Sequence, residues 1–510
     1  MSILSIRFLV FYNTKNRQMS FSSRAKRCMA SSFIGRTKEL DSLKHLLDKR
    51  NTASLVVLKG RRRIGKSRLI EEFAKRNSFD HFYVFSGIPP TKKTTAQSER
   101  DEFSRQLGRM LNIEGIKAED WSTLFLLLAD RVQHGRTLIL FDEISWMGSK
   151  DPDFLGKLKN AWDLKFSKNE KLILVLCGSV SAWIEENIIR STGFFGRPSL
   201  TLTLEELPLS VCNQFWEKRG RGISAYEKFK ILSVIGGVPR YLELINPTLS
   251  AEENIKQLCF MKNSILLNEY ELIFNDIFSK RSLIYKNIIE QLVQGSANQN
   301  EIAKKLSLAR AGNLSNYLDE LTISGFIERD YTWALKTGKI SGLSNYRLKD
   351  NYLRFYLKYL RALKPKIEKG IFNEISLTAL PNWDIMMGLQ FENLVLNNHP
   401  ELIQSIGINP GEIVFCNPFF QRKTVRQAGC QIDYLIQTRF DTAYVCEIKF
   451  SRYEIGMDII DEMTRKIERL KLPRHFSYRP VLIHVNGVRE DVKDSNFFSK
   501  IIDFSQFLSG

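Results

Sequence analysis

An eight-residue segment near the start of the chain has the residue types that bind phosphate groups. It fits the pattern GxxxxGK[ST] and comprises Gly60, Arg61, Arg62, Arg63, Ile64, Gly65, Lys66 and Ser67. Glycines let backbone N–H groups turn inward around phosphate oxygens, a lysine supplies a cation to the β and γ phosphates, and a serine hydroxyl suits Mg²⁺. We expect all of these residues, together with Arg68, to bind ATP.

The flanking sequence predicts a strand before this segment and a helix after it. The apolar run Leu55–Leu58 precedes the segment, and a helical pattern from Arg68 to Lys75 follows it. A helix N-terminus adds a dipole that favours bound phosphate. A basic surface turn is the alternative, and the flanking pattern disfavours it.

Two acidic residues could complete a magnesium site. Asp142 and Glu143 come directly after the apolar run Leu138–Phe141. At the carboxyl end of a buried strand, both side chains would face the ligand crevice of a parallel sheet. We expect Asp142 to hold Mg²⁺ with Ser67, and Glu143 to orient or deprotonate the attacking water.

Two further polar residues lie where they could contact the γ-phosphate. Ser179 ends the apolar run Leu176–Ser179, so it could sense the γ-phosphate or simply cap a helix. Arg197 follows Gly196 in a loop and could act as an arginine finger that offsets transition-state charge. A structural ion pair is the alternative for Arg197.

The last part of the chain holds a second set of acids and a lysine. Glu447 and Lys449 are two apart in a strand-like run, so both should project from one face. Asp433 lies in an earlier strand-like run, and antiparallel pairing would place it beside Glu447. Two carboxylates and a lysine can hold Mg²⁺ and activate water for attack on a phosphodiester. The alternative is an ordinary edge hairpin with an exposed ion pair.

Short apolar runs alternate with helical patterns from about residue 31 to residue 245. This alternation predicts an α/β fold, a P-loop NTPase with a parallel sheet and helices on both faces. The expected strands are Ser54–Leu58, His81–Ser86, Thr137–Phe141, Lys171–Cys177 and Ser199–Leu204.

In the middle of the chain the sequence predicts a helical lid followed by a winged helix. Three short helices before a polar hairpin predict the winged helix: Leu283–Gln294, Gln299–Leu306 and Leu314–Ser324. Polar residues near the third helix, namely Arg310, Asn313, Ser315 and Asn316, could contact DNA. A lid or a protein contact is the alternative role. Lys364 and Pro365 are expected to mark a boundary after an aromatic-rich helical stretch.

Six motifs occur in a fixed order: Phe33-Ile34-Gly35-Arg36 with Glu39-Leu40, GRRRIGKS, LILFDEISWM, CGS, FFGR and Ile235–Leu242. Over residues 31–245 this order resembles the archaeal-type ATPase family, a branch near the AAA+ and STAND ATPases. The resemblance implies that Gly35, Arg36 and the turn containing Pro239 flank the adenine of ATP.

The C-terminal region resembles the PD-(D/E)xK nuclease fold and the uncharacterised domain that accompanies archaeal-type ATPases. The resemblance implies that Asp433, Glu447 and the helical Glu392 bind metal, and that Glu447 and Lys449 are catalytic. Ile432 stands where the motif's name has Pro. We expect a mixed α/β nuclease-like domain.

Composition narrows the choice of partners. Lys and Arg number 75 against 56 Asp and Glu, a formal charge of +19, which suits DNA as a partner. The alternative is solubility charge spread over a large surface. The seven cysteines form no CxxC pair, which favours a reducing cytoplasm. No apolar run approaches the roughly 18 residues of a membrane span, so we expect no membrane partner.

The sequence therefore predicts four segments: a poorly ordered extension over 1–30, an ATPase domain over 31–245, a lid and winged helix over 246–345, and a nuclease-like domain over 346–510. The first functional hypothesis is an ATPase that couples ATP and Mg²⁺ to DNA binding or cleavage. The alternative is a STAND-like ATP-dependent signalling switch or a protein-interaction ATPase, without nuclease activity. The sequence leaves open a homo-oligomer, and it leaves open whether Arg197 acts within its own chain or across an interface.

Overall fold

The computed structural model describes residues 33–48, 52–217, 222–278, 282–307, 312–372, 376–425 and 427–509. The predicted extension over residues 1–30 and the predicted DNA contact Arg310 lie outside the described residues.

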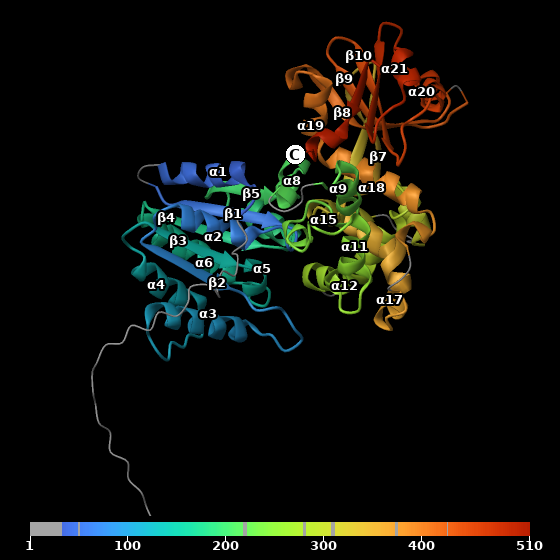
Figure 1. Ribbon diagram of the computed structural model, residues 1–510. Helices are drawn as coiled ribbons and strands as arrows, with labels where there is room; N and C mark the ends of the chain where they lie inside the picture. Colours follow the sequence, from blue (N-terminus) through green and yellow to red (C-terminus); the bar gives the residue numbers. More distant parts are fainter. Residues whose placement is uncertain are drawn as a thin grey trace, which may run out of the picture. The chain divides into compact units, whose positions relative to one another are not determined.

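The first part of the chain forms a five-stranded parallel sheet with the strand order β2-β3-β4-β1-β5. Figure 1 shows these strands interleaved with helices. The elements are α1 (Thr37–Asp48), β1 (Ser54–Gly60), α2 (Lys66–Arg76), β2 (His81–Ser86), α3 (Ala96–Leu111), α4 (Trp121–Arg131), β3 (Thr137–Asp142), α5 (Ile144–Met147), α6 (Phe154–Leu164), β4 (Leu172–Gly178), α7 (Ser181–Ile184) and β5 (Pro198–Leu204). The predicted α/β fold class and all five predicted strands are confirmed.

Alternating burial along the strands explains why helices cover both faces of this sheet. Leu55 and Val57 of β1 join a core with residues of α3, α4 and α6. Val56 and Leu58 point to the other face, because side chains alternate along a strand, and they are also fully buried. Helix α2 packs against β1, β3 and β4. Strands β1, β3 and β4 are therefore buried on both sides, and the carboxyl edge of the sheet bears polar side chains.

A helical region and a three-helix unit with a hairpin follow this sheet. The elements are α8 (Leu209–Glu217), α9 (Ala225–Ile235), α10 (Pro239–Leu242), α11 (Ala251–Ile255), α12 (Ile265–Phe278), α13 (Ser282–Gln291), α14 (Gln299–Lys305), α15 (Gly312–Ile323), β6 (Ile327–Ala334) and β7 (Lys339–Leu348). The predicted winged-helix elements are all present. The expected limit between residues 345 and 346 falls inside β7.

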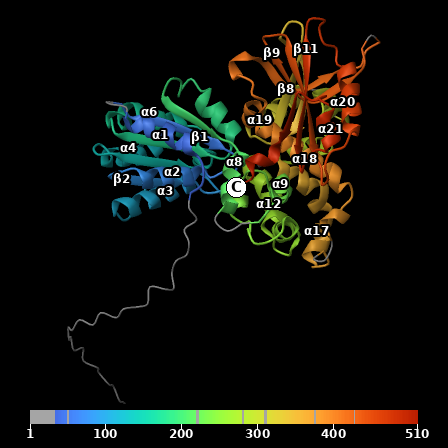
Figure 2. The same cartoon turned by 45° about the horizontal axis from the view of Figure 1, so that its top comes forward.

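The C-terminal part holds a mixed sheet with the strand order β12-β11-β10-β9-β8 (Figure 2). Its elements are α16 (Asn351–Phe355), α17 (Arg361–Glu368), α18 (Trp383–Asn397), α19 (His399–Ile406), β8 (Ile413–Gln421), β9 (Cys430–Thr438), β10 (Thr442–Phe450), α20 (Asp458–Arg469), β11 (Ser477–Val485), α21 (Glu490–Asp494) and β12 (Lys500–Asp503). Strands β8, β9 and β10 are antiparallel neighbours, whereas β10, β11 and β12 run parallel. The boundary expected at Lys364 and Pro365 is wrong, because Pro365 lies inside helix α17.

One continuous apolar core joins the helical region to the C-terminal sheet. It extends from Leu207 to Leu508 and includes residues of α9, α13, α16, α18 and β11. The β6–β7 hairpin also packs on the C-terminal sheet through Trp333, which lies in a core with Phe419 and Leu435. The Trp333 indole N–H donates to Gln437 Oε1 at 2.6 Å. This hairpin, which the sequence predicts as the wing of a winged helix, is therefore engaged within the chain.

Among the described ranges of the chain, no helix has the length and apolar character needed to span a bilayer.

Candidate functional site

The phosphate-binding segment forms a tight loop between β1 and α2. Gly65 stands before α2 with a φ of 91°, a left-handed conformation that favours glycine. Gly60 has a φ of 153°, and a Cβ there would lie 2.7 Å from the Leu204 carbonyl oxygen. Lys66 is buried, and its ammonium donates to the carbonyl oxygens of Gly60 at 2.9 Å and Arg61 at 3.1 Å. The loop therefore has the strand–loop–helix setting that the sequence predicts.

Ser67 and Asp142 meet at the carboxyl edge of the sheet. The Ser67 hydroxyl donates to Asp142 Oδ2 at 2.7 Å, although the two residues are 75 apart in the chain. Both supply hard oxygen donors, which Mg²⁺ prefers, and Mg²⁺ commonly binds few protein ligands while bound phosphates complete its shell. The residues present therefore fit a magnesium ion bound together with a nucleotide.

Glu143 is held by Ser179. Glu143 has a φ of 53°, which is uncommon outside glycine. The Ser179 hydroxyl donates to Glu143 Oε1 at 2.9 Å and Oε2 at 2.8 Å, and the Ser179 N–H donates to Oε2 at 3.1 Å. The expected roles of Ser179 were a γ-phosphate sensor or a helix cap, so this contact with Glu143 is one that the sequence reasoning missed.

Arg197 forms an ion pair, which was the alternative to its role as an arginine finger. Its Nε and Nη2 donate to Asp163 Oδ1 and Oδ2, each at 2.8 Å. These bonds from Arg197, ahead of those from Lys159, lower the pKa of Asp163 to about 2. Exposed pairs of this kind contribute roughly 0–1 kcal/mol. The arginine-finger role stays a prediction.

Of the residues expected to flank the adenine, Arg36 contacts the backbone of the phosphate loop. Arg36 Nη2 donates to the carbonyl oxygens of Ile64 at 3.3 Å and Glu205 at 2.6 Å. Gly35 has a φ of 74°, and a Cβ there would lie 2.5 Å from Val211. Pro239 is the first residue of helix α10.

Three arginines of the phosphate segment form ion pairs with later elements. Arg61 Nη1 pairs with Asp350 and with Glu206, Arg63 Nε pairs with Glu269 of α12, and Arg68 Nη1 pairs with Glu243 after α10. Arg62 is half-buried and Ile64 is fully buried. The sequence indicated these arginines only as phosphate ligands, and nothing local to the segment pointed to their distant partners.

The C-terminal acids lie on neighbouring antiparallel strands, as predicted. Asp433 is on β9 and Glu447 on β10, and Asp433 Oδ2 accepts from the Ile448 N–H at 2.9 Å. Lys449 Nζ lies 3.0 Å from Glu447 Oε1. A second lysine, Lys466, was not foreseen: its Nζ lies 2.5 Å from Glu447 Oε2 and 3.6 Å from Asp433 Oδ1.

Helices α18 and α20 contribute further charges to this cluster. Glu462 of α20 lies 2.9 Å from Lys449 Nζ, and its i,i+4 spacing to Lys466 was the available sequence signal. Burial, and then the charge of Glu392 on α18, raise the pKa of Asp433 to about 6. Burial, and then the charge of Asp433, raise the pKa of Glu447 to about 7. Asp433, Glu447 and Lys449 are therefore brought together, and Glu392 lies on α18, which packs against β10.

The donor set of this cluster fits a hard cation only in part. Asp433 and Glu447 supply adjacent carboxylate oxygens, and two carboxylates suffice for Mg²⁺ that keeps its waters. The Lys466 ammonium already lies between these carboxylates. Among the described residues, no group of three or more His, Cys, Asp or Glu side chains is arranged to hold a metal ion.

Replacing Lys466 by glutamine should therefore strengthen divalent-cation binding. Removing the ammonium leaves two neighbouring carboxylates without their shared cation, so we expect Mn²⁺ to bind at least about tenfold more tightly, ~1.4 kcal/mol. Titration calorimetry without nucleotide measures this, with the exposed Lys471→Gln as the matched control. Equal affinity in the two variants would contradict the competition between Lys466 and a metal.

Comparisons with known proteins find a protein family that matches the first part of the chain. Residues 33–245 match the family described as an ATPase domain predominantly from Archaea. An uncharacterized protein of Methanocaldococcus jannaschii is 24% identical over 367 residues, which are 71% of this chain and 76% of that protein.

Two solved structures are also similar to the chain. The Walker-type ATPase of Pyrococcus abyssi is 15% identical with a TM-score of 0.45, and the match covers 64% of this chain and 96% of that one. The Aeropyrum pernix ORC2 protein is 15% identical with a TM-score of 0.39, covering 67% and 96%. The family match therefore covers the part of the chain that holds the phosphate-binding loop, Asp142 and Glu143.

Proposed function

We propose that the chain binds and hydrolyses ATP with Mg²⁺, and that ATP controls the action of the C-terminal region on DNA. The main support for hydrolysis is the meeting of Lys66, Ser67, Asp142 and Glu143 at one edge of the sheet. The family match over residues 33–245 supports it further. We retain the segment 31–245 as the proposed ATPase domain, whereas a limit between residues 345 and 346 would divide strand β7.

Each residue of the first site has a role in this proposal. Backbone N–H groups of the loop enclose the phosphates, and Lys66 turns its ammonium from the loop carbonyls to the β and γ oxygens. Ser67 and Asp142 hold Mg²⁺, which would neutralise developing phosphate charge. Glu143 orients the attacking water or accepts its proton. Gly35, Arg36 and Pro239 flank the base, and Arg197 serves as the finger residue.

For the C-terminal region we propose metal-dependent cleavage of DNA. Support comes from the convergence of Glu392, Asp433, Glu447 and Lys449, and from the formal charge of +19. In this proposal Lys449 orients the attacking water or stabilises the phosphate in the transition state, and the acids hold the metal.

A plasmid-nicking assay tests this cleavage. Purified protein with Mg²⁺ or Mn²⁺ is expected to convert supercoiled plasmid to nicked circles. The Lys449→Ala variant should do so at least about 100-fold more slowly, because it removes a positioned proton-transfer or charge-stabilising group. Lys471→Ala, which changes an exposed lysine outside the cluster, is the control. Equal nicking by Lys449→Ala and wild type, or none by either, would contradict cleavage at this cluster.

A second candidate function is an ATP-dependent signalling switch without nuclease activity. The observation that favours it is the packing of the β6–β7 wing on the C-terminal sheet through Trp333, which leaves this hairpin engaged within the chain. Light scattering with and without ATP separates the candidates. A switch should change its oligomeric state on binding ATP, and its ATP hydrolysis should not respond to DNA.

A further inference from the structure

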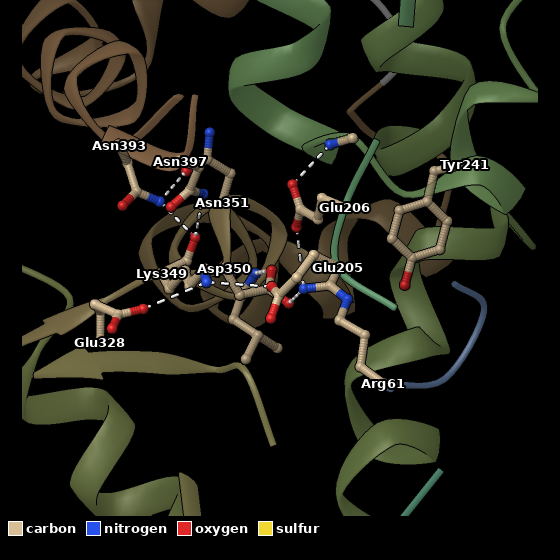
Figure 3. A network of polar contacts seen from close by, with 12 residues as sticks. Arg61, Glu205, Glu206, Tyr241, Glu328, Lys349, Asp350, Asn351, Asn393 and Asn397 are labelled. Atoms are coloured by element: carbon tan, nitrogen blue, oxygen red, sulfur yellow. Dashed lines mark hydrogen bonds and ion pairs between the residues drawn. The ribbon is translucent and has the colours of Figure 1, made fainter. Parts of the chain in front are cut away.

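A buried polar network begins at the phosphate loop and extends to Asn393 of helix α18 (Figure 3). Its first link is the ion pair between Arg61 and Asp350, which are 289 residues apart in the chain. Arg61 is 8% exposed and Asp350 is 1% exposed, so solvent screens this pair little. Asp350 also stands at the start of α16, where its Oδ1 accepts from the Leu353 N–H at 2.9 Å. The Asp350 carboxylate therefore joins the phosphate loop to this helix.

The next residue extends the link to helix α18. Asn351 Nδ2 donates to the Gln390 carbonyl oxygen at 3.1 Å, and Gln390 Nε2 donates back to the Asn351 carbonyl oxygen at 2.7 Å. Asn393 Nδ2 donates to Asn351 Oδ1 at 2.7 Å. Asn351, Gln390 and Asn393 are all fully buried. A shift at the start of α16 would thus break paired hydrogen bonds unless α18 moved with it.

Two arginines hold α18 on either side of Glu392. Arg354 Nη1 donates to Gln390 Oε1 at 3.0 Å, and Arg347 Nη1 donates to Asn393 Oδ1. Burial raises the pKa of Glu392, and Arg347 and Arg354 are the two largest opposing charges. Helix α18 also packs against β10, the strand that bears Glu447 and Lys449. The network therefore ends beside the C-terminal acids.

We propose that Arg61 and Asp350 are positioning residues that transmit nucleotide binding at the phosphate loop to helix α18, and thereby set the place of Glu392 in the carboxylate cluster. One guanidinium is shared between the acids Asp350 and Glu206. A bound triphosphate adds several negative charges beside the same loop, so it changes how strongly Arg61 holds Asp350. This link rests on the proposed ATP binding. It gives the phosphate loop a second role beside binding phosphate, namely the positioning of helix α18.

Hydrogen–deuterium exchange of the full chain tests the link. A non-hydrolysable ATP analogue with Mg²⁺ should change amide exchange in α18 of the wild type at least about threefold. Asp350→Asn removes the charge but keeps a good helix cap, and Glu206 remains to pair with Arg61. This variant should bind the analogue within about tenfold of wild type and lose the change in α18.

A matched control and a second variant make the result decisive. Glu243→Gln breaks the Arg68–Glu243 pair, which also joins the phosphate segment to a later element but does not lead to α18. It should keep the wild-type response. Arg61→Gln removes the other partner of the Arg61–Asp350 pair. The double variant with Asp350→Asn should lose no more of the exchange response in α18 than either single variant. Thermal unfolding confirms that each protein is folded.

The outcomes separate this link from the function on which it rests. Nucleotide binding is measured by calorimetry on the same samples. Binding without any change in α18 of the wild type, or a full response in both Asp350→Asn and Arg61→Gln, would overturn the link and leave ATP binding intact. Absence of nucleotide binding by the wild type would overturn the proposed function and the link together.

Discussion

Lys66→Ala should lower ATP affinity by about 100-fold or more and abolish hydrolysis. A lysine bound to phosphate oxygens makes charge-assisted hydrogen bonds of roughly 1.5–3 kcal/mol each, so losing two of them costs at least about 3 kcal/mol. This ammonium contacts the carbonyl oxygens of Gly60 and Arg61, within the loop that would enclose the phosphates. Calorimetric binding of ATP and release of inorganic phosphate measure the effect.

The control for this variant lies on the same helix. Lys75 is exposed on α2, so Lys75→Ala changes the same residue type without touching the loop. It should bind and hydrolyse ATP as the wild type does. Normal hydrolysis by Lys66→Ala would show that the assignment of the phosphate loop is wrong.

Glu143→Gln should bind ATP about as tightly as the wild type and turn it over at least about 100-fold more slowly. The amide oxygen of glutamine can still accept hydrogen bonds from Ser179, so the side chain should keep its place. The amide cannot act as a base, however, and general-base catalysis contributes roughly 100- to 10,000-fold. The variant therefore separates binding from chemistry.

Single-turnover kinetics measures this effect without the interference of product release. Glu186→Gln, which changes an exposed acid outside the site, serves as the control. Turnover by Glu143→Gln at the wild-type rate would remove Glu143 from the role of base or water-orienting group.

The sequence alone was sufficient to predict the parts of the site that are built from short segments. The run Leu55–Leu58 followed by the glycine-rich loop specifies a strand, a turn and a helix within about twenty residues, because apolar runs, glycines and helix formers each act locally. The pairing of Asp433 with Glu447 was also accessible, since the two residues lie on successive strands that a short turn connects.

Contacts between residues that lie far apart in the sequence could not be predicted in the same way. Nothing near Arg61 indicates Asp350, and nothing near Glu143 indicates that Ser179 would hold its carboxylate. Such pairs depend on how whole elements pack, which local propensity does not determine. A local signal also gave one wrong prediction. Proline usually ends a helix, so Pro365 was expected to mark a boundary, but helix α17 continues through it.

The shared core from Leu207 to Leu508 constrains how this protein could be rearranged by recombination. A cut at residue 345 or 346 would pass through β7 and strip apolar side chains of the helical region from their partners on α18 and the C-terminal sheet. A graft that exchanges the C-terminal sheet for another would therefore have to import α9, α13 and α16 as well.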